Sequence, residues 1–226
     1  MLIYALIPAR SGSKGIKNKN IKLVKKKYLI NYTIEFSLKC KSIDRTFVST
    51  DSEKIRNISL DTGSEVPFLR LKKISRDKSS DIQCFQHFHK FLIKKNIKIP
   101  DYYLHLRVTS PIRSNKQIET AIKKLKKLKP DSLRFIKKTN YSAFKLWQIK
   151  KNYIEPFLKS KKEYHSMGRQ FLPQTYIHSG IGDFISPRAI ENNSMVGKKT
   201  AYILDNAKKY IDIDDLDDLK YFEKLI

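Results

Sequence analysis

Short apolar runs alternate with segments of helical periodicity along most of the chain. Leu2–Pro8 is a continuous apolar run that ends in proline, as a buried strand does. Arg45–Ser49 and Tyr102–Val108 are rich in β-branched and aromatic residues, which strands favour. The pattern therefore predicts strands in these three segments and in three shorter ones, namely Glu65–Leu69, Asp131–Ile136 and Thr200–Leu204.

Helical spacing of apolar residues marks the segments between these runs. It is clearest in Asn115–Leu128, which Pro130 follows, and it recurs in Ile82–Lys95. Asp51–Leu60, capped by Asp51 or Ser52, and Leu216–Ile226 are two further predicted helices. Asn31–Lys39 alternates like a strand, but Asn31 could cap a helix and the position between two strands favours one.

This order of elements indicates a layered α/β fold with one interruption. From 141 to 186 the helical periodicity disappears and aromatic residues, prolines and glycines become frequent, which is typical of hairpins or an inserted arm. We therefore expect an α/β domain formed by 1–140 and 187–226, and an arm formed by 141–186. Tyr210–Ile213 is expected to be extended. In such a sheet ligands bind at the carboxyl ends of the strands.

Composition narrows the class of protein. The 226 residues are 40% hydrophobic, which is enough for a core and excludes wholesale disorder. No apolar run approaches the roughly 20 residues of a membrane span, and the N-terminus lacks the pattern of a signal peptide. The two cysteines, Cys40 and Cys84, have no metal-ligand spacing and are expected to be reduced thiols of a cytoplasmic protein.

The net charge of +25 admits two interpretations. It could mark a nucleic-acid-binding protein, or a soluble enzyme with a lysine-rich surface. The lysines are scattered along the whole chain instead of gathering in one stretch, so we favour the second and expect no nucleic-acid partner.

The loop directly after the first strand, residues 9–20, carries the strongest chemical signal. Its small residues, backbone N–H groups and four cations could wrap a polyphosphate. It is neither a Walker A loop nor a dinucleotide fingerprint, because GxxxxGK[ST] and GxGxxG are both absent. An exposed basic turn is the alternative on composition.

Acidic residues gather near the C-terminus. Asp212 and Asp214 alternate with Ile211 and Ile213, so an extended backbone would point both carboxylates to one side. Paired carboxylates of this kind suit Mg²⁺, which also holds substrate phosphates and waters. Asp215 and Asp217 are instead expected at a helix N-terminus, where the dipole favours acids. The two histidines of His87-x-His89 would point apart on a helix, so we assign them a structural role.

Six segments, in order along nearly the whole chain, resemble the acylneuraminate cytidylyltransferases, which make CMP-activated sialic acids and related nonulosonic acids. They are IPARSGSKGIKNKN (7–20), VSTD (48–51), VPFLR (66–70), TSPIR (109–113), RQFLP (169–173) and DID (212–214). The chain departs from the family at Arg107, Val108 and Ser179, where Gln, Pro and Asn are usual. These positions lie near the sugar in that family, so they bear on the identity of the acceptor.

The resemblance implies a three-layer nucleotide-diphospho-sugar transferase sandwich with a dimerisation arm. It also implies that the anomeric hydroxyl of a nonulosonic acid attacks the α-phosphorus of CTP in line and releases pyrophosphate, with Mg²⁺ as cofactor and a homodimer whose arm completes the partner's sugar site. The implied catalytic residues are Arg10, Lys14, Lys19 and Asp214, and the metal ligands are Asp212 and Asp214. The nucleotide-binding residues are Ser13, Gly15, Asn20, Arg70 and Ser80. The sugar-binding residues are Arg107, Thr109, Ser110, Lys145 and Arg169. The alternatives are cytidylyl transfer to a shorter 3-deoxy keto sugar acid, transfer to a hexose 1-phosphate, and a non-enzymatic nucleic-acid-binding protein.

Overall fold

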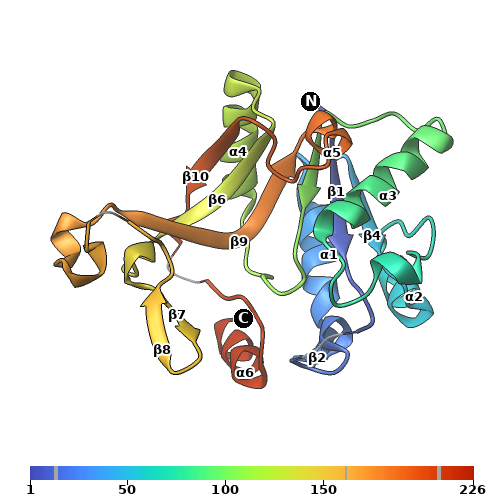
Figure 1. The fold of residues 1–226 in the computed structure, drawn as a ribbon. Coiled ribbons are helices and arrows are strands. Elements are labelled where there is room, and N and C mark those ends of the chain that lie inside the picture. The colour runs from blue at the N-terminus through green and yellow to red at the C-terminus, as the bar shows by residue number, and fades with distance from the viewer. Residues whose placement is uncertain (13–14, 161, 208–209) are drawn as a thin grey trace.

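The computed structural model describes residues 1–12, 15–160, 162–207 and 210–226. Its centre is a six-stranded sheet of order β10-β6-β9-β5-β1-β4 (Figure 1). The strands are β1 (Ile3–Pro8), β4 (Arg45–Ser49), β5 (Tyr102–His105), β6 (Ser132–Thr139), β9 (Thr175–Ile185) and β10 (Thr200–Leu204). Five run parallel, and β9 lies antiparallel between β5 and β6. The predicted mostly parallel α/β sheet is confirmed.

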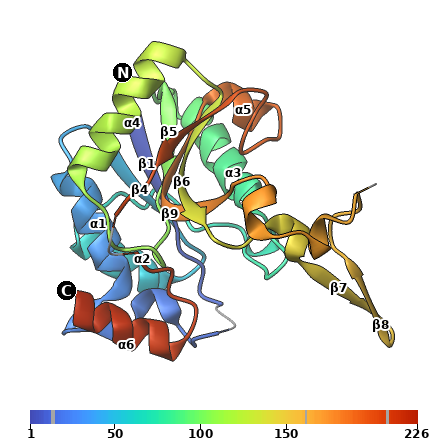
Figure 2. The same ribbon diagram turned by 90° about the vertical axis from the view of Figure 1, so that its left-hand side faces the viewer.

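Helices cover both faces of this sheet, which makes three layers (Figure 2). One face packs against α1 (Leu29–Lys39), α2 (Glu53–Asp61), α4 (Asn115–Leu128) and α6 (Leu216–Leu225). The other packs against α3 (Asp81–Lys94) and α5 (Pro187–Glu191). Alternation along β1 explains this arrangement, because Ile3, Ala5 and Ile7 enter one core while Tyr4 and Leu6 enter the other.

Two local predictions are decided by the neighbouring strands. Asn31–Lys39 is helical, within α1, because the parallel strands β1 and β4 need a crossover between them. That helix begins after Tyr28 and not at Asn31. Glu65–Leu69 is not a strand and forms two isolated bridges, to Phe47 of β4 and to Thr50 directly after it. Pro67 lies between those bridges and cannot donate to a ladder.

The arm is shorter than predicted. β7 (Trp147–Lys150) and β8 (Tyr153–Pro156) form the expected hairpin, but residues 175–185 are β9, inside the sheet. The boundary predicted at 186 is therefore wrong, and the arm comprises the described residues of 140–174. β6 and β9 stay paired up to Thr139 and Thr175, so the arm leaves and rejoins the sheet at one point. Its remaining elements are short 3-10 turns, η3 (Ala143–Lys145), η4 (Tyr164–Ser166) and η5 (Arg169–Phe171).

The other short elements lie outside the sheet. After the first loop come the turn η1 (Lys19–Ile21) and a small two-stranded sheet of β2 (Leu23–Val24) and β3 (Lys27–Tyr28). The turn η2 (Lys72–Ile74) precedes α3. Tyr210–Ile213 belongs to no strand, although Ile211 and Ile213 are buried as the alternation predicted. In the part of the chain that the structure describes, every helix is too short or too polar to cross a membrane.

Candidate active site

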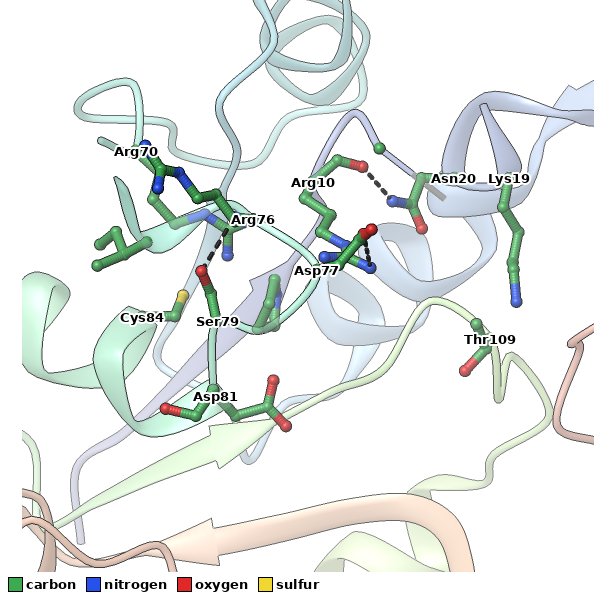
Figure 3. Close-up of a pocket in the computed structure, with 14 residues that line it drawn as sticks. Arg10, Lys19, Asn20, Arg70, Arg76, Asp77, Ser79, Asp81, Cys84 and Thr109 are labelled. Atoms are coloured by element: carbon green, nitrogen blue, oxygen red, sulfur yellow. Dashed lines mark hydrogen bonds and ion pairs between the residues drawn. The ribbon is translucent and has the colours of Figure 1, made fainter. Parts of the chain in front are cut away.

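A pocket of about 320 Å³ opens at the carboxyl end of the sheet (Figure 3). Its walls come from the loop after β1, the segment between β4 and α3, and the loop after β5. Six of the predicted site residues line it: Arg10, Lys19, Asn20, Arg70, Ser80 and Thr109. Arg70 lies at one end, whereas Lys19 and Thr109 lie at the other. Segments far apart in the sequence thus meet where the topology predicts a ligand site.

The loop after β1 is held by its own hydrogen bonds. The side-chain amide of Asn20 donates to the carbonyl oxygen of Arg10 at 2.9 Å. Asp51, just after β4, accepts from both the backbone N–H and the hydroxyl of Ser11, each at 2.8 Å. The Arg10 guanidinium reaches Asp77 across the pocket at 3.1 Å. These bonds fix the backbone and aim Arg10 into the pocket. Ser13 and Lys14 lie outside the described residues.

Arg70 is anchored at the other end of the pocket. Its backbone N–H donates to the Thr50 carbonyl at 2.6 Å, and its Nε donates to the Ser75 hydroxyl at 3.0 Å. The residue is buried, and the thiol of Cys84 lies beside it in the pocket wall. Burial raises the pKa of Cys84, so this thiol stays protonated near neutral pH.

The C-terminal acids stand beside the Lys19 end of the pocket. The buried Lys19 ammonium donates to the Ile213 carbonyl at 2.7 Å and to Asp214 Oδ1 at 3.1 Å. Ser110 donates its hydroxyl to Asp212 Oδ1 at 3.3 Å, and the Ile213 N–H bonds the Thr109 carbonyl at 2.8 Å. The two carboxylates are exposed, as the alternation with Ile211 and Ile213 predicted.

Gly15 is required where these two segments meet. A Cβ on this residue would lie 2.4 Å from the Asp214 carbonyl oxygen, which is a backbone atom held by its neighbours. The loop after β1 and the acidic segment therefore approach each other as closely as only glycine permits.

The later acids belong to the start of α6. Asp215 caps the helix by accepting from the N–H groups of Asp217 and Asp218, both at 2.9 Å. The predicted helix N-terminus is thereby confirmed for Asp215 and Asp217. Asp218 in turn accepts from the backbone N–H of Asp214 at 2.9 Å, and so fixes the backbone of a predicted metal ligand.

Asp212 and Asp214 offer only carboxylate oxygens to a metal ion. Among the described residues no cluster of three or more His, Cys, Asp or Glu side chains surrounds a common point. Two exposed carboxylates beside a pocket lined by cationic side chains nevertheless fit Mg²⁺, which takes one or two carboxylates and fills its remaining positions with waters and phosphate oxygens.

The residues predicted to bind the sugar lie near an ion-paired group beside the pocket. Arg107 donates to Asp183 of β9 at 3.0 Å and lies 3.7 Å from Asp81, which lines the pocket. Burial, and next the charge of Arg107, lower the pKa of the neighbouring His105 to about 4, so this imidazole is neutral. Gly180 has a φ of +69°, and a Cβ there would lie 2.3 Å from the Ser110 hydroxyl. Thr109 thus lines the pocket, Arg107 reaches it through Asp81, and Ser110 contacts Asp212.

Comparison with known proteins decides the family. Residues 4–175 match the family described as Cytidylyltransferase. The chain belongs to the cytidylyltransferase family. It is 30% identical over 241 residues to the CMP-N,N'-diacetyllegionaminic acid synthase of Legionella pneumophila, covering 100% of this chain and 97% of that protein. It is 28% identical over 217 residues to the pseudaminic acid cytidylyltransferase of Campylobacter jejuni, covering 96% and 92%.

A third relative is longer than this cytidylyltransferase. The N-acylneuraminate cytidylyltransferase of Escherichia coli is 31% identical over 193 residues, covering 78% of this chain and 44% of that protein. The chain therefore spans less than half the length of that relative. A solved CMP:2-keto-3-deoxy-manno-octonic acid synthetase complexed with CTP aligns with a TM-score of 0.68 at 14% identity, covering 100% of this chain and 98% of that one. A 4-diphosphocytidyl-2C-methyl-D-erythritol synthase aligns with a TM-score of 0.70 at 10% identity, covering 99% and 97%. These two likenesses confirm the sandwich fold.

The two predicted arm residues do not reach the pocket of their own chain. Lys145 ends η3 and Arg169 begins η5, both on the arm of this cytidylyltransferase. Arg169 lines a separate cavity of about 160 Å³ with Leu172 and Pro173. In both ribbon views the arm projects away from α1, α2 and α3.

The sequence missed several residues around the site. Arg76 and Ser79 line the pocket from the segment that leads into α3. Asp183 lay inside the stretch assigned to the arm. The predicted structural role of the two histidines is confirmed, because His89 contacts the Tyr103 hydroxyl at 2.6 Å while the His87 ring packs on Phe68.

Proposed function

We propose that this cytidylyltransferase transfers CMP from CTP to a nonulosonic acid and releases pyrophosphate. The observation that carries the proposal is the loop after β1, which turns Arg10, Lys19 and Asn20 into a pocket beside two exposed carboxylates. The acceptor class is supported by two relatives that align over more than nine tenths of both chains, which are named for legionaminic and pseudaminic acid.

The pocket has a direction that suits a nucleoside triphosphate. Arg70 and Ser80 would hold the nucleoside end, and Asn20 would hold the turn of the loop against it. Arg10, together with Ser13, Lys14 and Gly15 of the same loop, would hold the phosphates. Lys19 and the acids mark the end at which the acceptor meets the α-phosphorus.

Charge stabilisation and positioning supply the catalysis in this proposal. The sugar's anomeric hydroxyl attacks the α-phosphorus and pyrophosphate leaves, so no covalent protein intermediate is needed. Arg10 and Lys19 are donors placed where negative charge grows on the phosphate oxygens. Asp212 and Asp214 would hold Mg²⁺, which lowers the cost of charge on the attacking and leaving oxygens.

The arm and the location are proposed on separate grounds. We propose that a second copy contributes Lys145 and Arg169, which would meet the sugar acid from the other chain of a homodimer. We propose a cytoplasmic location because both cysteines are buried free thiols, the state that reducing compartments maintain.

The test is pyrophosphate release from the purified full chain with Mg²⁺ and a panel of sugar acids. The panel holds sialic, legionaminic and pseudaminic acids and an eight-carbon 3-deoxy keto acid, each offered with CTP, UTP, ATP and GTP. We expect acceptor-dependent release with CTP and a nonulosonic acid. Comparable kcat/KM with a purine nucleotide contradicts the assignment of CTP. Salt-dependent retention of nucleic acid without turnover supports the binding protein instead.

A further inference from the structure

A row of polar side chains crosses three strands next to the pocket. His105 of β5 and Arg134 of β6 are both register partners of Asp183 on β9, so the three side chains share one face of the sheet. It is the face covered by α3, because the His105 ring packs on Phe85. Arg107 connects the row to the pocket through Asp81, and His178 ends the row on the arm side.

The two arginines of this row differ in how their charge is met. Arg107 lies 3.0 Å from Asp183 and 3.7 Å from Asp81, so two carboxylates face one guanidinium. Arg134 approaches Asp183 only to 4.0 Å through Nε, which is beyond hydrogen-bond distance. That Nε is closed off from water and has no hydrogen-bond partner among the described residues.

His178 orients Arg134 without cancelling its charge. Arg134 Nη1 and His178 Nε2 are 2.6 Å apart. Burial lowers the pKa of His178; the charge of Asp183 opposes this shift and the charge of Arg134 adds to it. The imidazole is therefore neutral at pH 7 and accepts this hydrogen bond. The row thus pairs two arginines with two aspartates, and within the described chain Arg134, whose side chain is 21% exposed, has only the longer 4.0 Å ion pair with Asp183.

Resting on the proposed function, we propose that Arg134 binds the carboxylate of the sugar acid from the same chain that holds the nucleotide. A guanidinium fixed on one side offers its remaining N–H groups to a planar carboxylate in a geometry that an ammonium does not match. Arg107 is the poorer candidate because Asp183 and Asp81 already neutralise it. Lys145 and Arg169 of a second copy would approach the same group from the opposite side.

The experiment compares the best acceptor of the screen with its carboxamide, in which the carboxylate charge is removed. Wild type is expected to favour the acid over the amide in kcat/KM by at least about tenfold, the scale of one charge-assisted hydrogen bond. Arg134→Gln should raise the KM for the acid by a similar factor and abolish the preference, while the KM for CTP changes less than about twofold. Arg56→Gln, which removes an exposed arginine paired with Glu53 on α2, should keep the preference.

Arg134→Lys separates binding from a purely structural role. Lysine restores the positive charge but not the planar pair of N–H donors, so this variant should recover part of the preference for the acid over the amide. An unchanged preference in Arg134→Gln overturns the inference and leaves the proposed function intact. If both Arg134 variants lose the same factor in kcat/KM with the acid and with the amide, the inference is also overturned, because Arg134 then only stabilises the fold. If wild type releases pyrophosphate with none of the acids, both this inference and the proposed function are overturned.

Discussion

At the scale of single residues, the acidic segment is held by contacts that leave its carboxylates facing outward. Lys19 bonds the Ile213 carbonyl, Thr109 bonds the Ile213 N–H, and Asp218 bonds the Asp214 N–H. All three of these bonds go to the backbone. The Asp214 side chain, which is 81% exposed, keeps most of its oxygen lone pairs for a ligand.

Asp214→Asn is accordingly expected to keep the backbone in place and lose turnover. Removing one charge-stabilising group from a transition state of this kind costs roughly 10²-fold in kcat. Steady-state pyrophosphate release measures the loss. Asp212→Asn should be impaired in the same direction.

Asp217→Asn is the matched control, three positions away. Its carboxylate pairs with Lys220 on the exposed side of α6, outside the pocket. An exposed pair of this kind is worth about 0–1 kcal/mol, so activity should be nearly unchanged. Equal losses in Asp214→Asn and Asp217→Asn would show that the metal ligands are misassigned.

The glycines of the first loop give a second test. In Gly15→Ala the new Cβ would meet the Asp214 carbonyl at 2.4 Å, so the loop and the acidic segment must separate. We expect a lower Tm and a loss of activity. In Gly12→Ala the Cβ would have nothing within 4 Å, so Tm should stay the same. Thermal unfolding of both variants and of wild type measures the Tm. An unchanged Tm in Gly15→Ala would contradict the close approach of the loop to the acidic segment.

What the sequence predicted of the site follows from how its residues are spaced. Arg10, Lys19 and Asn20 were predictable because their loop follows a buried strand, whose end forms a ligand site, and because the loop resembles the first motif of the family. Arg134 and Asp183 were not, because they lie on different strands and meet only through the register of β6 and β9. Asp183 lies in a glycine-rich segment, where a single acidic residue carries no periodic signal.

At the scale of elements, β9 is where pattern reading failed. Its buried half alternates Gly180 and Gly182 with Ile181 and Asp183, and glycine and aspartate are residues that strands disfavour. Gly182 is needed because a Cβ would lie 2.9 Å from Leu104 on the neighbouring strand. α4 was predictable to the residue, because its apolar stripe and its Ser114 cap are both local signals.

Asp131 links α5 to the segment before β10, and this contact predicts a pH-dependent stability. It accepts from Arg188 of α5 and from the N–H groups of Lys198 and Lys199, which lead into β10. The Arg188 hydrogen bond, followed by the backbone bonds, lowers the pKa of Asp131 from 3.8 to about 2. Because the folded-state pKa lies below the unfolded one, this stabilisation is present above pH 3.8 and is lost as the pH falls towards 2.

Asp131→Asn should therefore lower Tm near pH 7, and the difference from wild type should shrink between about pH 4 and pH 2. Thermal unfolding followed by circular dichroism across this range measures it. Glu119→Gln, an exposed change on α4, should track wild type throughout. A difference that persists undiminished at pH 2 contradicts the assignment of the ionised carboxylate.

At the scale of the whole molecule, the arm exposes several large apolar side chains. Tyr141 and Tyr153 are each 80% exposed, Ile149 is 81% exposed, and Phe171 is 71% exposed. Large apolar side chains that gather on one exposed segment are typical of an interface. This agrees with the proposed homodimer, in which the arm covers the site of a second chain.

Mixing two inactive variants tests that arrangement. Asp214→Asn disables the metal ligand of its own chain, and Arg169→Ala disables the arm. If sites are completed across the dimer, hybrids of the two carry one doubly defective site and one intact site, so activity should return after subunit exchange. Size-exclusion chromatography with light scattering gives the oligomeric state. A monomer, or hybrids that stay inactive, would assign the arm to its own chain.

The pairing of Thr139 with Thr175 has a consequence for how this protein could acquire new acceptors. Since the sheet itself brings those two residues together, the intervening 35 residues form a cassette whose ends are already joined. Lengthening or replacing it adds little loop-closure entropy and leaves the register of β6 and β9 untouched. Acceptor preference could thus diverge through exchange of this cassette, while the nucleotide-handling half of the molecule is inherited unchanged.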